Sequence, residues 1–535
     1  MIRTDRFWDL VEQRAAQTPD RVLFADEDGR TMTFGAYRDA ALAVAAGLRS
    51  LGIGVGPERR DEVIAWQLPT SIEAAVMMAA ASRLDLTQAP VIPLLREREV
   101  GHIVGQLADK VGPVTLVVPG VLRGFDHVAM AESISVNSGC MVLVADESHW
   151  PAHTNPWALN LPTGDPAMLP EPPDHRPGTV RWIYSTSGTT SVPKLARHTD
   201  ATALATTVHF EEGIGFVPDD VTVLASPIAH VGGVLTLGSA LMIGFEMTLV
   251  RHFDPIATPQ LCSERDMSVL RGAAPVARAF IEAQLAMPDR RLFPRLRACQ
   301  GGGSARPIDV HEGMKSVFGI SGATASYGMT ECPGITACRP TDSEDHIAGT
   351  SGRIVRGCSI LVIGPDGSLL EPGEEGELLV SGPMQFLGYV DSSLDAAAFD
   401  ERTFDGRHYV RSGDLGIVDA EGWVQVTGRI KDVIIRNGEN ISAQLVEDVL
   451  SLHPDIRDAA VIAVPDARTG ERACAVVALR EGVAQLTLTD VIRHCEESGL
   501  ARQRFPEQLE IVDEVPRNAI GKIEKQALRD RYAKR

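Results

Sequence analysis

The chain has 535 residues, a net charge of −20 and a mean hydropathy near zero. At about 100–200 residues per domain, this length predicts several structural units with a large apolar core. The acidic balance argues against a general nucleic-acid-binding surface, because phosphate backbones bind clustered Lys and Arg side chains.

Taken in order, the first part of the chain alternates predicted helices and strands. Helices are predicted at residues 7–17, 33–51, 71–83 and 96–107, and short strands at 63–67, 91–94, 114–118 and 141–144. This alternation is typical of α/β layers around a mainly parallel sheet. Eight prolines between Pro151 and Pro177 then predict an irregular surface connection.

A polar loop, Ser-Thr-Ser-Gly-Thr-Thr-Ser-Val-Pro-Lys, follows a predicted strand at residues 179–184 and ends at Lys194. Gly188 permits unusual backbone angles, the hydroxyl side chains can donate hydrogen bonds, and Lys194 supplies a positive charge. These groups suit a polyphosphate ligand, although a polar surface turn has a similar composition. The spacing from Gly188 to Lys194 matches a Walker A loop. However, Pro193 and Leu195 replace its second glycine and its magnesium-binding residue, which argues against an ordinary P-loop NTPase.

Beyond the loop, Asp200 is predicted to cap a helix that runs to Thr207. Further strands are predicted at residues 221–225, 296–299, 376–380 and 422–427. Residues 228–245 form the most apolar stretch and contain no Asp, Glu, Lys or Arg. Because this stretch contains His230 and several glycines, it predicts buried core beside a ligand pocket rather than a transmembrane helix.

The C-terminal part, from residue 433, predicts a smaller α+β unit. Strands are predicted at residues 433–435, 459–464 and 473–479, helices at 444–452 and 487–499, and a turn at 437–440.

Cysteine usage and the start of the chain predict the compartment. The eight cysteines are scattered and contain no CxxC pair, which predicts free thiols in a reducing cytosol. The first 14 residues mix charges and lack an apolar run, so no signal peptide is expected.

Six segments occur in the order of the signature motifs of a known family. They are residues 185–194, 301–304, 325–331, 409–414, 428–432 and 516–523. The chain resembles the adenylate-forming superfamily, which includes acyl-CoA synthetases, luciferases and the adenylation domains of peptide synthetases, over nearly its whole length. It departs from the family pattern at Ser191, at Leu195-Ala196 and mildly at Gly303-Ser304.

The resemblance implies a nucleotide site built from several of these segments. The residues expected to bind ATP or AMP are Thr186, Ser187, Gly188, Thr189, Thr190, Lys194, Gly302, Gly303, Ser304, Tyr327, Gly328, Thr330, Asp414, Arg429 and Lys522. The expected catalytic residues are Lys522, Thr330, Glu331 and His230, and Glu331 is also the expected Mg²⁺ ligand. By the same resemblance, Tyr327 would stack on adenine and Asp414 would accept the ribose hydroxyls. Local sequence alone favours a solvated lysine at position 522 and a turn residue at position 414.

The resemblance also implies an acyl pocket, a coenzyme A site and a hinge. The acyl pocket is expected at His230, Val231, Gly233, Val234, Gly301 and Met329, the coenzyme A site at Arg436, Asn437 and Gly438, and the hinge at Lys431. The glycines Gly232, Gly233 and Gly301 to Gly303 suggest an open pocket, and Val231, Val234 and Met329 suggest an apolar one. Peptide-synthetase adenylation domains have an aspartate at the position of His230, so amino acid substrates are not expected. Without the family, His230 reads as a satisfied core histidine.

These motifs predict an α/β protein in which a large multi-layer N-terminal AMP- and acyl-binding domain (residues 1–428) and a hinge (429–432) precede a small mobile α+β domain (433–535). The predicted activity is that of an acid–thiol ligase. ATP and a carboxylic acid give acyl-AMP and pyrophosphate, and coenzyme A then takes the acyl group and releases AMP. Residues 90–100 resemble members that act on medium-chain or alicyclic acids.

The expected partners are a small carboxylic acid, ATP, Mg²⁺ and coenzyme A, in a cytoplasmic protein without a nucleic-acid partner or a transmembrane segment. An acyl-AMP ligase that loads a carrier protein and a nucleotide-binding protein without turnover stay open as alternatives. The oligomeric state also stays open, with a homodimer as one option.

Overall fold

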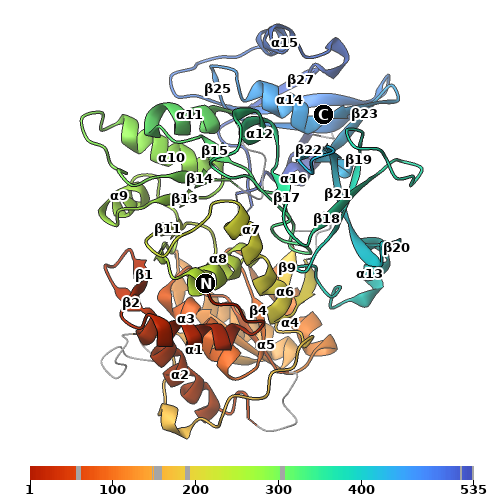
Figure 1. Ribbon diagram of the computed structural model, residues 1–535. Helices are drawn as coiled ribbons and strands as arrows, with labels where there is room; N and C mark the ends of the chain where they lie inside the picture. Colours follow the sequence, from red (N-terminus) through yellow and green to blue (C-terminus); the bar gives the residue numbers. More distant parts are fainter. Residues whose placement is uncertain are drawn as a thin grey trace.

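The computed structural model describes residues 1–55, 62–146, 149, 159–186, 193–301, 308–518 and 521–532. Figure 1 shows a large N-terminal part, coloured red to teal, and a smaller blue C-terminal part that lies on one end of it. The predicted α/β architecture, with a large N-terminal and a small C-terminal domain, is confirmed.

Two mainly parallel sheets form most of the N-terminal domain. The first has the order β15-β14-β13-β11-β12-β1-β2, and the second β10-β9-β4-β3-β5-β8. The strands of the first are β1 (Val22–Asp26), β2 (Thr31–Thr33), β11 (Val221–Leu224), β12 (Glu246–Leu249), β13 (Val269–Arg271), β14 (Ala298–Gln300) and β15 (Ala323–Thr324). Those of the second are β3 (Val63–Trp66), β4 (Thr87–Pro90), β5 (Val114–Pro119), β8 (Met141–Ala145), β9 (Trp182–Thr186) and β10 (Lys194–His198). Ligands of such sheets bind beyond the carboxyl ends of the parallel strands.

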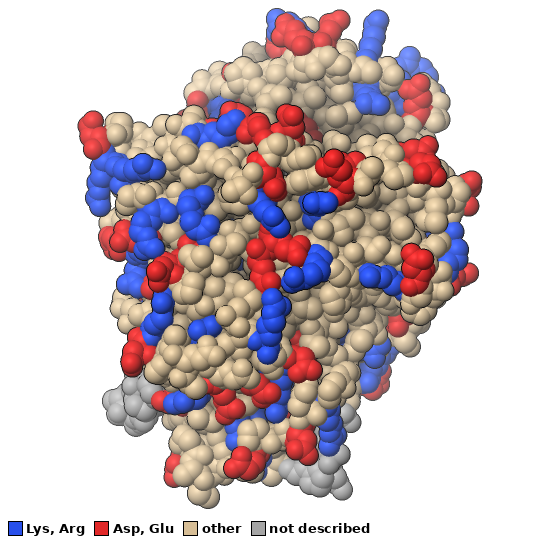
Figure 2. All heavy atoms as spheres, in the orientation of Figure 1, with Lys and Arg blue, Asp and Glu red and all other residues tan. Residues whose placement is uncertain are grey.

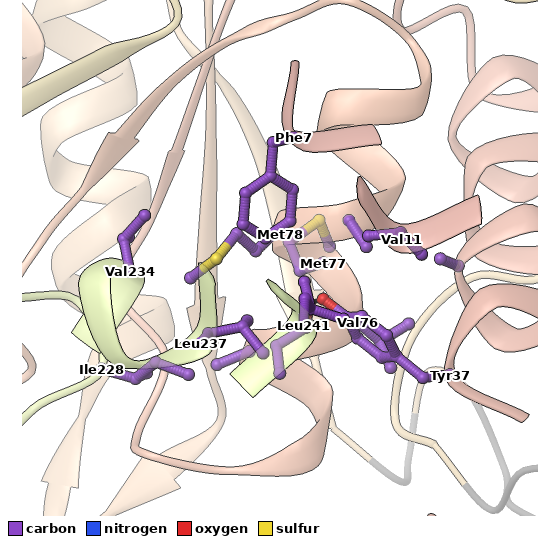
Figure 3. Packing of buried hydrophobic residues seen from close by; sticks show 14 of the residues in the cluster. Phe7, Val11, Tyr37, Val76, Met77, Met78, Ile228, Val234, Leu237 and Leu241 are labelled. Carbon is purple, nitrogen blue, oxygen red and sulfur yellow. Dashed lines mark hydrogen bonds between the residues drawn. The ribbon is translucent and has the colours of Figure 1, made fainter. Parts of the chain in front are cut away.

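Helices α3 (Ile72–Arg83) and α8 (Val231–Ile243) form an apolar layer between these two sheets. Nearly every residue of both helices is buried, in a core that also takes Trp66 from one sheet and Phe24 from the other. Figure 3 shows side chains of α3 and α8 packed around Phe7. A helix that is apolar all round is typical of a protein core. Among the described residues, no helix is long and apolar enough to cross a membrane.

The remaining N-terminal helices cover the sheets. They are α1 (Phe7–Gln17), α2 (Phe34–Ser50), α4 (Glu97–Lys110), α5 (His127–Ser138), α6 (Asp200–Ala205), α7 (Thr207–Glu212), α9 (Ala257–Glu264), α10 (Ala274–Leu285), α11 (Ile308–Phe318), α12 (Glu344–Gly349) and α13 (Asp395–Ala398). A third, antiparallel sheet contains β18 (Ser359–Ile363), β19 (Glu375–Ser381), β20 (Phe399–Phe404), β21 (Arg407–Val418) and β22 (Val424–Arg429). Short strand pairs are β6 (Val121–Leu122) with β7 (Phe125–Asp126), and β16 (Thr336–Ala337) with β17 (Arg353–Ile354).

The C-terminal domain is one sheet with helices on both faces. Its strands are β23 (Val433–Arg436), β24 (Glu439–Ser442), β25 (Ile456–Asp466), β26 (Gly470–Leu479) and β27 (Gln508–Val512), and its helices are α14 (Ala443–Leu450), α15 (Leu488–Glu497) and α16 (Lys525–Tyr532). Val461 packs with the α14 and α15 side, whereas the next residue, Ile462, packs with α16. This alternation gives the domain two apolar layers of its own.

Two local predictions are wrong. The strand expected at residues 91–94 lies instead at β4, whose polar sequence is buried because it pairs with β3 and β9 on its two sides. Asp200 does not cap its helix, because Thr199 Oγ1 accepts the hydrogen bond from the Thr202 N–H. The Asp200 carboxylate instead accepts from the Phe7 N–H and the Trp182 indole, which ties α1 to β9.

Figure 2 shows acidic and basic side chains interspersed over one face of the molecule. Ion pairs among the described residues include Arg278 with Asp309, where Nε and Oδ2 are 2.8 Å apart.

Candidate functional site

Asp414 and the residues around it form one polar network. Asp414 on β21 and Arg429 on β22 are cross-strand partners, and Arg429 Nε lies 2.8 Å from Asp414 Oδ1. The Tyr327 hydroxyl donates to Asp414 Oδ2 at 2.8 Å. Burial and this carboxylate raise the pKa of Tyr327 well above its usual value, so the phenol stays neutral. Asp414 is thus a strand residue rather than a turn residue, and each carboxylate oxygen can still accept from a ligand hydroxyl.

Lys522 reaches this network from the C-terminal domain. Its backbone N–H donates to Asn518 Oδ1 at 3.0 Å, which stabilises the turn that presents the lysine. Burial, and after it the charge of Arg429, lowers the pKa of Lys522 to about 8, although the carboxylates of Asp414 and Glu331 act in the opposite direction. Charges influence one another to this extent only at short range, so residues from two domains converge here.

Glu331 follows the 325–330 segment and is buried, with 7% of its surface exposed. The Tyr389 hydroxyl donates to Glu331 Oε1 at 2.6 Å. The ammonium of Lys194 lies 5.2 Å from the centre of the Tyr389 ring, within the range of a cation–π contact. Tyr389 therefore stands between the lysine that ends the polar loop and the expected metal ligand.

His198 ties the strand after the polar loop to the same segment. Its Nε2–H donates to the carbonyl of Thr330 at 2.9 Å, and Nδ1 lies 3.1 Å from Thr202 Oγ1. Burial lowers the pKa of His198 to about 4, so the ring is neutral at physiological pH. The backbone of Thr330 is thereby fixed relative to Lys194, which lies on the same strand.

His230 is the N-cap of α8. Its Nδ1 accepts from the Gly232 N–H at 3.2 Å, which orients the ring at the start of the helix. Burial lowers the pKa of His230 to about 4, and the nearby charge of Lys522 acts in the same direction. A neutral imidazole therefore lies within electrostatic reach of Lys522. Val231 and Val234 of the same helix are buried in the core.

The glycines expected to open the pocket differ in what surrounds them. Among the described residues, a Cβ on Gly232 would meet only the His230 ring, and one on Gly301 would meet no atom closer than the Thr324 carbonyl at 3.8 Å. A Cβ on Gly233 would lie 2.2 Å from the carbonyl oxygen of Ile228. Gly233 is therefore required by close packing, and the expectation that it opens the pocket is wrong. Met329 packs against a different cluster, the one beneath the third sheet.

A cleft of about 1050 Å³ separates the two domains at this point. Its lining includes Tyr327, Gly328, Asp414, Arg429 and Lys522. A cleft of this size accommodates a nucleotide, since pockets for drug-sized ligands span about 300–1,000 Å³. Gly328 cannot carry a side chain here, because a Cβ would lie 2.3 Å from the Gly334 nitrogen.

Comparison with known proteins identifies this arrangement. Residues 11–390 match the AMP-binding enzyme family, and residues 445–522 match the C-terminal domain of AMP-binding enzymes. The chain belongs to this family. It is therefore an ATP-dependent adenylating ligase that activates an acid, and the resemblance found in its motifs is confirmed.

Relatives of this AMP-binding enzyme differ in the acceptor that their names give. This chain is 29% identical to the medium-chain fatty-acid–CoA ligase of Escherichia coli K12, over 97% of this chain and 89% of that one. It is 31% identical to the salicyl-AMP ligase/salicyl-S-ArCP synthetase of Mycobacterium tuberculosis H37Rv, with the same coverage. Among solved structures, ATP-bound MatB from Rhodopseudomonas palustris shares the fold, with a TM-score of 0.83 at 24% identity over 98% of this chain and 99% of that one.

The residues expected to bind coenzyme A and to form the hinge lie in and before the C-terminal domain of this AMP-binding enzyme. Lys431 lies in the 3-10 turn η5 (Ile430–Asp432) between β22 and β23. Asn437 and Gly438, with φ angles of 51° and 81°, form the exposed turn between β23 and β24. Arg436 forms an ion pair with Glu507, with Nε 2.7 Å from Oε2.

Several expected site residues lie outside the described residues: Ser187, Gly188, Thr189, Thr190, Gly302, Gly303 and Ser304. The described chain on either side of the first group is a two-stranded hairpin in which Thr186 pairs with Lys194. Motif reasoning missed Tyr389 and His198. The one sequence signal for His198 is its place four residues after Lys194, on the same face of a strand.

Proposed function

We propose that this enzyme is an acid–thiol ligase that joins a carboxylic acid to coenzyme A through an acyl-AMP intermediate. The observation that carries the proposal is the convergence of Lys522, from the C-terminal domain, with Asp414, Glu331 and His230 of the N-terminal domain. Such a site combines a cation, a metal-type carboxylate and a ribose-type carboxylate around one interdomain cleft. Those are the groups that nucleotidyl transfer from ATP requires.

In the proposed first step, a carboxylate oxygen of the acid attacks the α-phosphorus of ATP. An O–P bond forms to give acyl-AMP, and the bond to the bridging oxygen breaks, so that pyrophosphate leaves with the electron pair. In this proposal Lys522 stabilises the charge that develops on the α-phosphate, and Thr330 donates a hydrogen bond to it. No nucleophile from the protein is needed.

Mg²⁺ fits this site as a co-substrate ion. Glu331 is a buried carboxylate with Oε1 held by Tyr389, and such hard oxygen ligands suit Mg²⁺ together with phosphate oxygens. Bound there, the ion would offset the negative charge of the polyphosphate. Tyr327 stacks on adenine and Asp414 accepts from the ribose hydroxyls in this proposal.

In the second step, the thiol of coenzyme A attacks the acyl carbon, a thioester forms, and AMP leaves. We assign residues 1–428 to the N-terminal domain, 429–432 to the hinge and 433–535 to the mobile domain. Lys431 would allow the small domain to turn, and the Asn437–Gly438 turn would then border the pantetheine path. No residue from 436 to 438 is among the described residues that line the ATP cleft, which supports separate faces for the two steps.

The acid is proposed to be a medium-chain fatty or alicyclic acid, which the name of the Escherichia coli relative supports. His230 at the start of α8 provides no carboxylate for a substrate amine, so amino acids are expected to be poor substrates. The eight free cysteines support a reducing, cytoplasmic location.

One observation favours a second candidate. The Mycobacterium tuberculosis relative is named for loading a carrier protein, and it is as similar to this chain as the coenzyme A ligase is. The alternative is an acyl-AMP ligase whose acceptor is the phosphopantetheine arm of such a carrier. The two candidates share the first step and differ only in the acceptor thiol.

Mass spectrometry of one reaction series tests both. Purified protein is mixed with ATP, Mg²⁺ and a panel of carboxylic and amino acids, with coenzyme A, a phosphopantetheinylated carrier protein or no acceptor. We expect acyl-CoA and AMP with coenzyme A, and acyl-AMP with pyrophosphate when no acceptor is present. Transfer to the carrier alone would establish the second candidate. ATP binding without pyrophosphate release for any acid would reject both in favour of a nucleotide-binding protein without turnover.

A further inference from the structure

Arg271, the last residue of β13, has a hydrogen-bonding environment unlike that of its neighbours. Burial lowers its pKa to about 10, and no described residue forms an ion pair with it. Its Nε is buried without a hydrogen-bond partner among the described residues. Nearby arginines of the same domain do have carboxylate partners, as in the pairs Arg265–Glu246 and Arg297–Asp220. An unpaired buried cation is costly to fold, which points to a partner supplied by a ligand.

A second buried donor lies beside the first. Gln300 on β14 is the in-register partner of Arg271, so their side chains leave the sheet on the same face. Gln300 is 3% exposed and its side chain hydrogen-bonds to His209, but its Nε2 has no hydrogen-bond partner among the described residues. Two N–H donors on adjacent parallel strands therefore point to one missing acceptor at the carboxyl edge of the sheet.

The other contacts of Arg271 fix its position without neutralising it. Its Nη1 donates to Thr236 Oγ1 at 2.5 Å, and that hydroxyl in turn donates to the Gly232 carbonyl at 2.7 Å. The guanidinium also lies 4.2 Å from the centre of the Phe210 ring. Burial, together with the charge of Arg271, lowers the pKa of His209 to about 4, so the His209 ring is neutral.

This cluster is continuous with the expected acyl pocket. Thr236 and Gly232 are one turn apart on α8, on one face of the helix, and His230 caps that helix. Gly301 directly follows Gln300 in the chain. Among the described residues, a Cβ on Gly301 would meet no atom closer than 3.8 Å, and one on Gly232 would meet only the His230 ring, with Nδ1 at 3.3 Å. The six residue-to-residue steps from His230 to Thr236 correspond to about 9 Å along the helix.

We propose that Arg271, with Gln300, binds a second carboxylate at the far end of the acid substrate. This rests on the proposed function, because His230 and Lys522 would receive the carboxylate that reacts. The preferred substrate is then a dicarboxylic acid with a medium-length or ringed spacer, rather than a simple fatty acid. Arg271 is a specificity-determining residue, since it offers the fork of donors that matches a carboxylate.

The test compares a diacid with its own half-ester. Pyrophosphate release is measured for adipate, monomethyl adipate and hexanoate, and the series is extended to succinate, glutarate and suberate to find the best length. We expect kcat/KM for the best diacid to exceed that for its half-ester by about 10²-fold, the order of effect seen when one partner of a buried charge pair is removed. In Arg271→Met this ratio should fall to about one, and in Arg271→Lys it should be partly restored.

The ratio of kcat/KM for the diacid to that for its half-ester is unaffected by a misfolded fraction of the protein, because inactive protein lowers both rates equally. Arg265→Met, which removes an arginine paired with Glu246 away from the cluster, should keep the wild-type ratio. A wild-type enzyme that uses hexanoate and rejects every diacid would overturn this inference and leave the proposed function standing. An unchanged ratio in Arg271→Met would also overturn it. Absence of pyrophosphate release with all acids would remove the proposed function and this inference together.

Discussion

On the nucleotide side of the site, the two motif carboxylates already have partners within the protein. Asp414 is bound by Tyr327 and Arg429, and Glu331 by Tyr389. On the acyl side, Arg271 has an N–H donor that no described residue accepts. A site prebuilt in this way suits a ligand that is always the same, such as ATP, because little rearrangement is needed on binding. Unsatisfied donors instead mark the part of the site that selects one acid from many.

The strongest test of the nucleotide side is removal of the Lys522 ammonium, which is the group that the C-terminal domain is expected to contribute. Lys522→Ala should slow pyrophosphate release by on the order of 10²–10³, as for the loss of one electrostatic contact to a transition state. Thioester formation from synthetic acyl-AMP should survive, because that reaction bypasses the α-phosphate step.

Equal losses in the two half-reactions of Lys522→Ala would mean that the lysine supports the fold rather than adenylation. Lys525→Ala provides a comparison in the same segment, although it removes the buried pair with Glu447. A thermal unfolding curve for each variant shows how much of either loss comes from stability.

Tyr389→Phe should slow pyrophosphate release less than Lys522→Ala does. The cause of this smaller loss should be weaker binding of Mg²⁺. The hydroxyl that holds Glu331 Oε1 is lost while the ring facing Lys194 stays. Loss of a group that orients a metal ligand typically costs about 10–100-fold in metal affinity. We therefore expect a higher Mg²⁺ concentration for half-maximal pyrophosphate release, with a smaller change at saturating Mg²⁺. A uniform drop at all Mg²⁺ concentrations would argue that Tyr389 does not act through Glu331.

Gly438→Leu should distinguish the ATP cleft from the turn that we propose borders the coenzyme A path. Its φ of 81° is unfavourable for leucine by roughly 1–2 kcal/mol. Thioester formation should slow while pyrophosphate release continues. Gly406→Leu is the matched control, since Gly406 has a φ of 73° and, like Gly438, no atom within 4 Å of its ideal Cβ. If both variants lose thioester formation alike, backbone strain rather than obstruction of the thiol path is the cause.

The smallest expected effect is a pH dependence of ATP use. The pKa of Lys522 is lowered to about 8, so the ammonium is charged below that pH and loses its proton as the pH rises through it. The kcat/KM for ATP in pyrophosphate release should therefore fall above pH 8, because this parameter reports on the free enzyme. In Lys522→Arg the fall should vanish, since arginine stays charged. A profile that falls equally in both proteins would assign the titration to another group.

Local sequence was sufficient where local physics decides the structure. The helix expected at residues 33–51 is α2, with Thr33 as its N-cap and Gly52 in a left-handed conformation after it. Local sequence was insufficient to predict contacts between segments that are distant along the chain. His198 and Thr330 are 132 residues apart, and Tyr389 and Glu331 are 58 apart. Such contacts depend on tertiary packing, so no spacing rule along the chain reveals them.

The same limit applies to the acyl side. Val231, Val234 and the glycines predicted an apolar, open pocket from residue type alone. The structure shows that Gly233 is packed against Ile228 and that a cation from another strand adjoins the same helix. Arg271 lies in none of the sequence motifs. Its lack of a carboxylate partner among the described residues becomes visible only once the carboxylates that pair with other arginines are located.

Heavy-oxygen labelling tests the central claim most directly. The acid is supplied with both carboxylate oxygens labelled, together with ATP, Mg²⁺ and coenzyme A, and the products are weighed by mass spectrometry. If the carboxylate attacks the α-phosphorus, one labelled oxygen stays with AMP and the other with the acyl-CoA. Unlabelled AMP beside acyl-CoA, or ADP and phosphate in place of AMP and pyrophosphate, would contradict the acyl-adenylate route.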